Sequence, residues 1–90
     1  MTGKAPEIKD IINYYKGFSL PELEAKATQL DNEQTHIREK ALQIINATEG
    51  TSLSESQEKI LLLLAYELET VEVELHIIKY VIQVKKIELL

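Results

Sequence analysis

The chain has 90 residues and a net charge of −5, and 44% of its residues are hydrophobic. This length predicts one domain, 1–90, at the small end of what folds alone. One Phe, four Tyr and no Trp predict an aliphatic core. The absence of Cys excludes disulfides, thiolate catalysis and cysteine-rich zinc sites. The acidic balance argues against generic binding to a phosphate backbone.

The N-terminal stretch MTGKAPEIKD is polar throughout, so no secretory signal is expected there. The longest apolar run is Ile60 to Tyr66, which is far shorter than the ~20 residues that span a bilayer. We therefore expect a soluble cytoplasmic protein that makes no contact with a membrane.

The first predicted element is a short helix over 6–16, in the segment PEIKDIINYYKGF. Pro6 suits the first turn of a helix and Gly17 suits the position just after its end. Phe18 can close over the apolar face of this helix. Four side chains share that face: Ile8, Ile11, Ile12 and Tyr15.

The second predicted element is a long helix over 20–48. Ser19 and Glu22, three residues apart in SLPE, predict a capping box at its start, and Gly50 ends it. Apolar, small or polar residues then recur at alternating steps of four and three, which is the spacing of a heptad seam. The seam consists of Leu23, Ala27, Leu30, Gln34, Ile37, Ala41, Ile44 and Thr48.

The third predicted element is a helix over 53–88, and the motif SLSE predicts Ser52 as its cap with Glu55 completing the box. The stretch ETVEVELHIIKYVIQV alternates like a strand for about eight residues. However, Ser52 to Leu90 contains no Gly, Pro, Asn or Asp, so no turn residue is available for a hairpin of strands. Helical spacing runs through the whole segment, in Leu61, Leu64, Leu68, Val71, Leu75, Ile78 and Ile82.

These elements predict an all-α fold: a long antiparallel helical hairpin plus a short N-terminal helix, together a three-helix bundle. The short connection ATEGTS sets the two long helices antiparallel, with Leu23 level with Ile78 and Leu30 level with Val71. The third helix carries a second apolar stripe, which the first helix is expected to cover from Val73 to Ile87. That stripe consists of Tyr66, Val73, Ile77, Tyr80, Val84 and Ile87.

The run from Ile60 to Tyr66 leaves two turns of the third helix without a polar side. Such a turn should be buried, and neither of the other helices is placed to cover it completely, so we expect it to meet a partner. The helix is acidic from Glu67 to Glu74 and basic from Lys79 to Lys86, which favours an antiparallel homodimer, with another helical protein as the alternative partner. The predicted partner interface is Leu62, Leu63, Tyr66, Val73, Ile77, Tyr80 and Val84.

No constellation in the sequence points to catalysis. His36 and His76 lie far apart in the antiparallel arrangement, and the one Glu-x-x-His match, Glu33 with His36, has no second copy of the kind a di-metal bundle site requires. The serines cluster at helix starts, where capping accounts for them. We therefore expect no enzyme activity, no catalytic residues, no metal, no cofactor and no small-molecule substrate.

The sequence thus predicts a non-enzymatic helical interaction module, either a small regulator or an adaptor. The alternative is a small dimeric nucleic-acid-binding regulator, with the first two helices as a helix–turn–helix around YYKGFS. Its acidic start at Glu22 and Glu24 would repel phosphates, so nucleic acid is not the expected partner. The cations for that alternative are Lys9, Lys16, Lys26 and Arg38.

Overall fold

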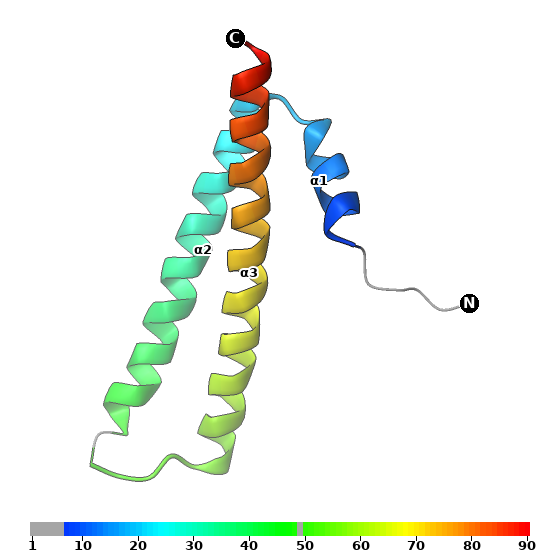
Figure 1. Cartoon of the computed structure of the whole chain (residues 1–90). Coiled ribbons are helices and arrows are strands. Elements are labelled where there is room, and N and C mark those ends of the chain that lie inside the picture. Colours follow the sequence, from blue (N-terminus) through cyan, green and yellow to red (C-terminus); the bar gives the residue numbers. More distant parts are fainter. Residues whose placement is uncertain (1–6, 49) are drawn as a thin grey trace.

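The computed structural model describes residues 7–48 and 50–90, and the described residues form three α-helices and no strand. Helix α1 spans Ile8–Lys16, α2 spans Leu20–Ala47 and α3 spans Glu55–Glu88. Helices α2 and α3 run antiparallel, and α3 packs against both α2 and α1 (Figure 1). The all-α class and the three-helix bundle predicted from the sequence are confirmed.

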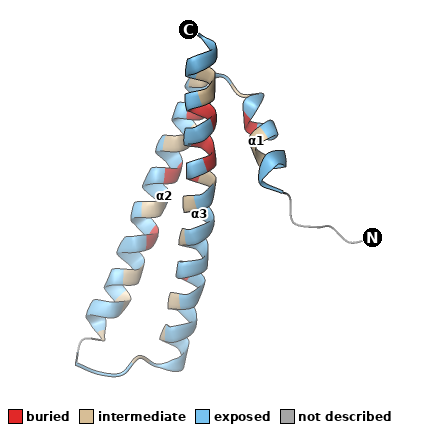
Figure 2. Ribbon diagram, viewed as in Figure 1, coloured by how far each residue is buried: buried red, intermediate tan, exposed pale blue. Residues whose placement is uncertain are grey.

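The core lies at the end of the hairpin where α1 joins it (Figure 2). Leu23, Ile78 and Val81 are fully buried there. Toward the connection between α2 and α3 the two helices diverge, and few residues are buried. The core cluster consists of Tyr15, Leu23, Leu30, Leu75, Ile77, Ile78, Val81 and Ile82.

The predicted seam between α2 and α3 is confirmed. Each of its eight positions on α2 is buried or half-buried, and so is each position on α3 from Leu61 to Ile82. On one side of this seam, polar side chains of α2 form hydrogen bonds with Glu72 of α3. Its Oε1 accepts hydrogen bonds from the Gln34 side-chain amide and from the Arg38 guanidinium, both at 3.2 Å.

The capping box predicted for α2 is present. The Glu22 backbone N–H donates to Ser19 Oγ over 3.3 Å, and the Ser19 backbone N–H donates to Glu22 Oε1 over 2.9 Å. Two of the backbone N–H groups that a helix start leaves without a partner are therefore satisfied.

The cap predicted for α3 is wrong by two residues. Ser54 caps this helix rather than Ser52, and Gln57 completes the box rather than Glu55. Both serines have a Glu or Gln three residues later, so the sequence contains two overlapping boxes. The later one places Glu55 and Glu58 in the first turn, where the helix dipole favours negative charge.

The helix ends also differ in detail from the prediction. Helix α1 begins at Ile8, and Pro6 lies outside the described residues. Gly17 is the C-cap of α1 with a φ of −76°, so it does not use the left-handed conformation. Gly50 does use it, with a φ of +83°, in the connection after α2.

The bundle is open and flat. Its principal-axis extents are 56 × 36 × 15 Å. The radius of gyration is 17.2 Å, whereas a compact domain of this length has about 12 Å. The accessible surface is 6891 Å², against about 5,400 Å² for a typical monomer of this mass.

Candidate protein–protein interface

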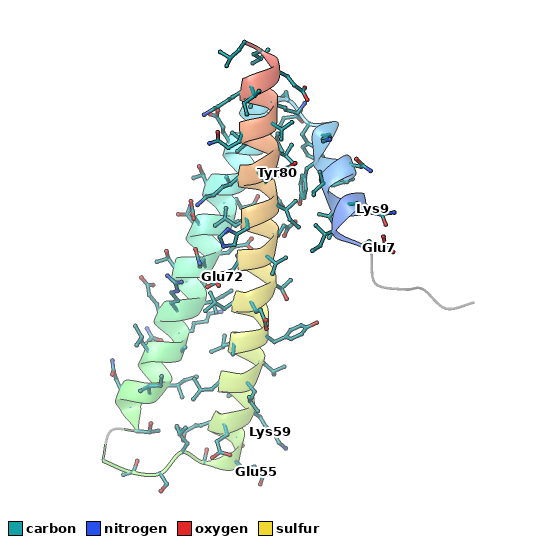
Figure 3. The ribbon with its side chains drawn as sticks, viewed as in Figure 1. Glu7, Lys9, Glu55, Lys59, Glu72 and Tyr80 are labelled. Atoms are coloured by element: carbon teal, nitrogen blue, oxygen red, sulfur yellow. The ribbon has the colours of Figure 1, made fainter. Side chains whose placement is uncertain are left out.

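Large apolar side chains of α3 are exposed on the side away from α2. Leu62, Leu63 and Tyr66 keep 71%, 63% and 70% of their surface in contact with solvent. Farther along the helix, Val73 and Tyr80 are exposed as well (Tyr80 is labelled in Figure 3). These five side chains are among the seven predicted for the partner interface, and Val84, at the end of that set, is half-buried.

Ile77 does not belong to this exposed surface, although it was predicted with it. It is only 7% exposed and lies in the core cluster with Tyr15. The reason is the length and direction of α1. Nine residues extend about 13 Å, so α1 covers one level of α3 rather than the whole stripe.

The divergence of α1 from α3 explains a second difference. Toward its N-terminus α1 points away from α3 (Figure 1), and Ile8, which was predicted on the buried face, is 61% exposed. Near its other end, Tyr15 packs into the core and its hydroxyl donates a hydrogen bond to the Glu74 carboxylate. Burial first, and then Glu74, raise the pKa of Tyr15, so this hydroxyl stays protonated and holds α1 against α3.

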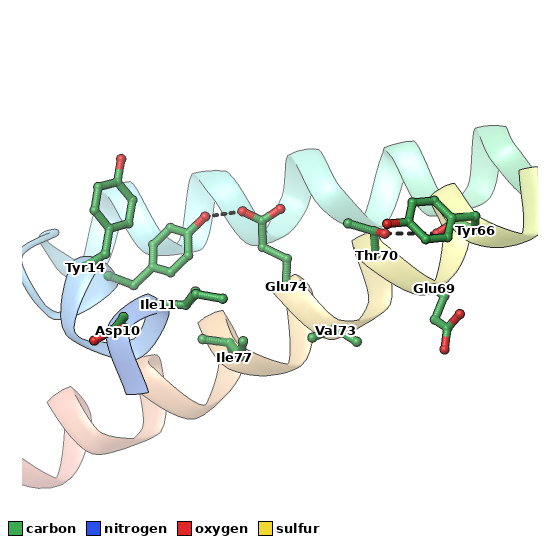
Figure 4. A pocket seen from close by; sticks show the side chains of 10 residues that line it. Asp10, Ile11, Tyr14, Tyr66, Glu69, Thr70, Val73, Glu74 and Ile77 are labelled. Carbon is green, nitrogen blue, oxygen red and sulfur yellow. Dashed lines mark hydrogen bonds between the residues drawn. The ribbon is translucent and has the colours of Figure 1, made fainter. Parts of the chain in front are cut away.

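The diverging helices leave an apolar groove of about 750 Å³ between α1 and α3. Ile11 and Tyr14 form its α1 wall, while Tyr66, Val73 and Ile77 lie along α3 (Figure 4). The α1 wall was not predicted from the sequence, because the tilt of α1 is set by its packing rather than by its own pattern of apolar residues. Thr70 also lines the groove, and the steps from residue 66 to 70, 73 and 77 follow a heptad that could have revealed it.

The rim of this groove is acidic. Asp10, Glu69 and Glu74 are among the ten residues that line it, and no Lys, Arg or His is. An apolar floor with an acidic rim complements a segment that carries apolar side chains flanked by basic ones.

A second hollow of about 450 Å³ lies between α2 and α3. Its lining includes Ile37 and Val71 together with the charged side chains of Glu67 and Lys40. Tyr66 borders both hollows and is itself mostly exposed. Tyr66 is therefore the centre of the candidate interface.

The four basic residues predicted to bind nucleic acid in the alternative hypothesis are not held at one place by shared salt bridges. Arg38 pairs with Glu72 at 3.2 Å, and Lys9 pairs with Glu7 at 3.5 Å (Figure 3). Lys16 is exposed on α1 and Lys26 is half-buried on α2.

The described ranges, 7–48 and 50–90, contain neither a candidate metal-binding cluster nor a candidate membrane span. No three side chains of His, Asp or Glu come together there in a way that could hold a metal ion. Among the same residues, no helix has the length and apolar character needed to cross a bilayer.

Comparisons with known proteins found no relative. No protein-family model matches the chain, and neither a curated protein nor a solved structure matches it. The exposed surface of α3 is therefore the feature from which a function can be proposed.

Proposed function

We propose that this chain is a non-enzymatic helical interaction module, a small regulator or adaptor of the cytoplasm, that assembles through the exposed side of α3 into an antiparallel homodimer. The observation that carries the proposal is the exposure of Leu62, Leu63 and Tyr66, each above 60%, within two consecutive turns. Contiguous exposed apolar surface of this kind marks interaction sites on soluble proteins.

The flat shape supports the same proposal. Stable domains bury the apolar side of each element between two packed layers, and here the three helices form one thin layer whose smallest extent is 15 Å. A second copy of the chain would supply the missing layer.

Charge favours the antiparallel arrangement. Between Glu67 and Glu74 there are four acidic residues and no basic one, and between Lys79 and Lys86 there are three lysines and no acidic residue. An antiparallel copy sets the acidic half of α3 beside the basic half of its partner, whereas a parallel copy sets like charges side by side.

Sedimentation equilibrium over a concentration series tests the proposal. A dimer that persists on dilution is expected for the parent chain, and Tyr66→Glu should return it to monomer because a carboxylate would have to be buried between the copies. Gln43→Glu is the matched control, since it adds the same charge at an exposed position on α2. A monomer at all concentrations, or equal loss of helicity and assembly in Tyr66→Glu, would contradict the proposal.

A further inference from the structure

We propose that the groove between α1 and α3 receives the C-terminal half of α3 from a second copy, and that the two-fold axis crosses α3 between residues 76 and 77. The inference rests on the proposed homodimer and specifies its register. Each protomer offers one groove and one inserting segment, so the contact is self-complementary and closes at two copies.

The spacing of the exposed apolar residues leads to this register. Tyr66, Val73, Tyr80 and Ile87 follow one another at intervals of seven and are each 47% exposed or more, so they form one line along the helix. An antiparallel copy centred between 76 and 77 places Tyr66 opposite Ile87 and Val73 opposite Tyr80. All four side chains then find an apolar partner.

The number of apolar pairs selects this register over its neighbours. A copy shifted by one heptad, with Tyr66 opposite Tyr80, places Ile87 opposite Lys59. A shift in the other direction leaves Tyr66 past the end of the partner's α3. In the proposed register the acidic stretch of α3 also runs alongside the basic stretch of its partner, which orients the two copies.

The groove itself fits the inserting segment. Its floor is apolar at Val73, and its rim carries Asp10 from α1 as well as the acidic side chains of α3. The segment 79–87 offers apolar Tyr80 and Ile87 with three lysines nearby. Tyr14, which is 64% exposed on the α1 wall, would be covered by the same segment. Helix α1 would therefore belong to the interface as well as to the fold.

Engineered cysteines test the register cleanly, because the chain has no Cys of its own. A disulfide requires two Cα atoms within about 7 Å. In the proposed register, residue 66 of one copy faces residue 87 of the other, while the two copies of residue 66 are 21 residues apart along the axis, about 30 Å. Tyr66→Cys and Ile87→Cys chains should therefore form a covalent dimer when mixed and oxidised, and neither should do so alone.

The matched control is a mixture of Tyr66→Cys with Leu42→Cys, whose cysteine is exposed on α2 and should stay reduced. A covalent dimer of Tyr66→Cys alone would overturn the inference, because it requires a parallel or shifted pairing. The mixture is oxidised at a chain concentration at which it still sediments as a dimer under reducing conditions, because loss of the Tyr66 ring weakens assembly. A mixture that is dimeric there without the 66–87 cross-link would overturn the register and leave the proposed homodimer standing. A parent chain that is monomeric in sedimentation would overturn both.

Discussion

Truncation of Tyr66 to Ala is the most direct test of the interface energetics. The free chain leaves 70% of this residue exposed, so the ring contributes little to the fold of one protomer. Ala also has the higher helix propensity, so α3 should remain helical. The change should therefore act on assembly and spare folding.

The size of the effect follows from the exposed area. A buried Tyr removes about 150–250 Å² from water, so covering the exposed share removes roughly 100–175 Å². At about 25 cal/mol per Å² this is about 3 kcal/mol per chain. Each dimer contains two copies of the contact, which gives about 6 kcal/mol, or a dimer Kd raised roughly 10⁴-fold. This value is an upper estimate, because the hydroxyl and the uncovered edge of the ring contribute little.

Sedimentation equilibrium of Tyr66→Ala and the parent chain measures this change, with circular dichroism as the check on helicity. Leu42→Ala is the control, because it truncates a side chain that is 55% exposed on α2 and lies outside the groove. The control should leave the dimer Kd within about threefold of the parent value. That corresponds to a change in binding free energy well under the ~1.4 kcal/mol of a tenfold change in Kd. The reasoning fails if Tyr66→Ala dimerises as tightly as Leu42→Ala.

Three further outcomes are expected from the fold. Ile78→Ala should cost about 2–5 kcal/mol in urea unfolding at fixed chain concentration, because Ile78 is fully buried, whereas half-exposed Ile45→Ala should cost far less. Ser54→Ala should cost about 1 kcal/mol and Ser52→Ala almost nothing, because only the first removes a cap; equal losses would contradict the observed box. Hydrogen bonds from the backbone N–H of the N-cap serine, and then from its side chain, lower the pKa of Glu22 from 4.5. Its contribution to stability should therefore be complete above the unfolded pKa and lost as pH falls through the lower folded value, so Glu22→Gln should flatten the pH dependence of thermal unfolding in that acidic range.

The hairpin could be predicted from the sequence because its determinants are local. The seam residues of α2 recur at steps of four and three, and the absence of turn residues after Ser52 leaves α3 one continuous element. A short connection then fixes the antiparallel direction. None of these steps requires knowledge of how a helix tilts.

The placement of α1 could not be predicted in the same way. Its apolar residues show which side of α1 is buried, but not the angle at which it crosses α3. That angle decides that Ile77 is buried while Tyr80 in the same stripe is 54% exposed. It also buries Val81, which lies in neither predicted stripe, because α1 approaches α3 between the stripes. The groove is a consequence of the tilt, so only its α3 side was visible in the sequence.

The cap of α3 shows a different limit. Ser52 and Ser54 both satisfy the capping-box pattern, and the local sequence ranks them equally. The choice between them depends on where the first turn places Glu55 and Glu58 relative to the helix dipole. When two capping boxes overlap in this way, the box pattern alone does not show which serine caps the helix.

The distribution of apolar side chains around α3 connects the fold to the proposed assembly. One direction, at Leu64 and Ile78, faces α2, and a second, at Ile77, faces α1. The third side of α3 includes Tyr66 and Val73, and no helix in the described part of the chain covers these side chains. A helix of 34 residues is about 50 Å long, so α1 at about 13 Å cannot reach most of that direction in any orientation. A second long helix could cover it, and α3 of another copy would bring the length, the apolar spacing and the opposite charge order for that contact.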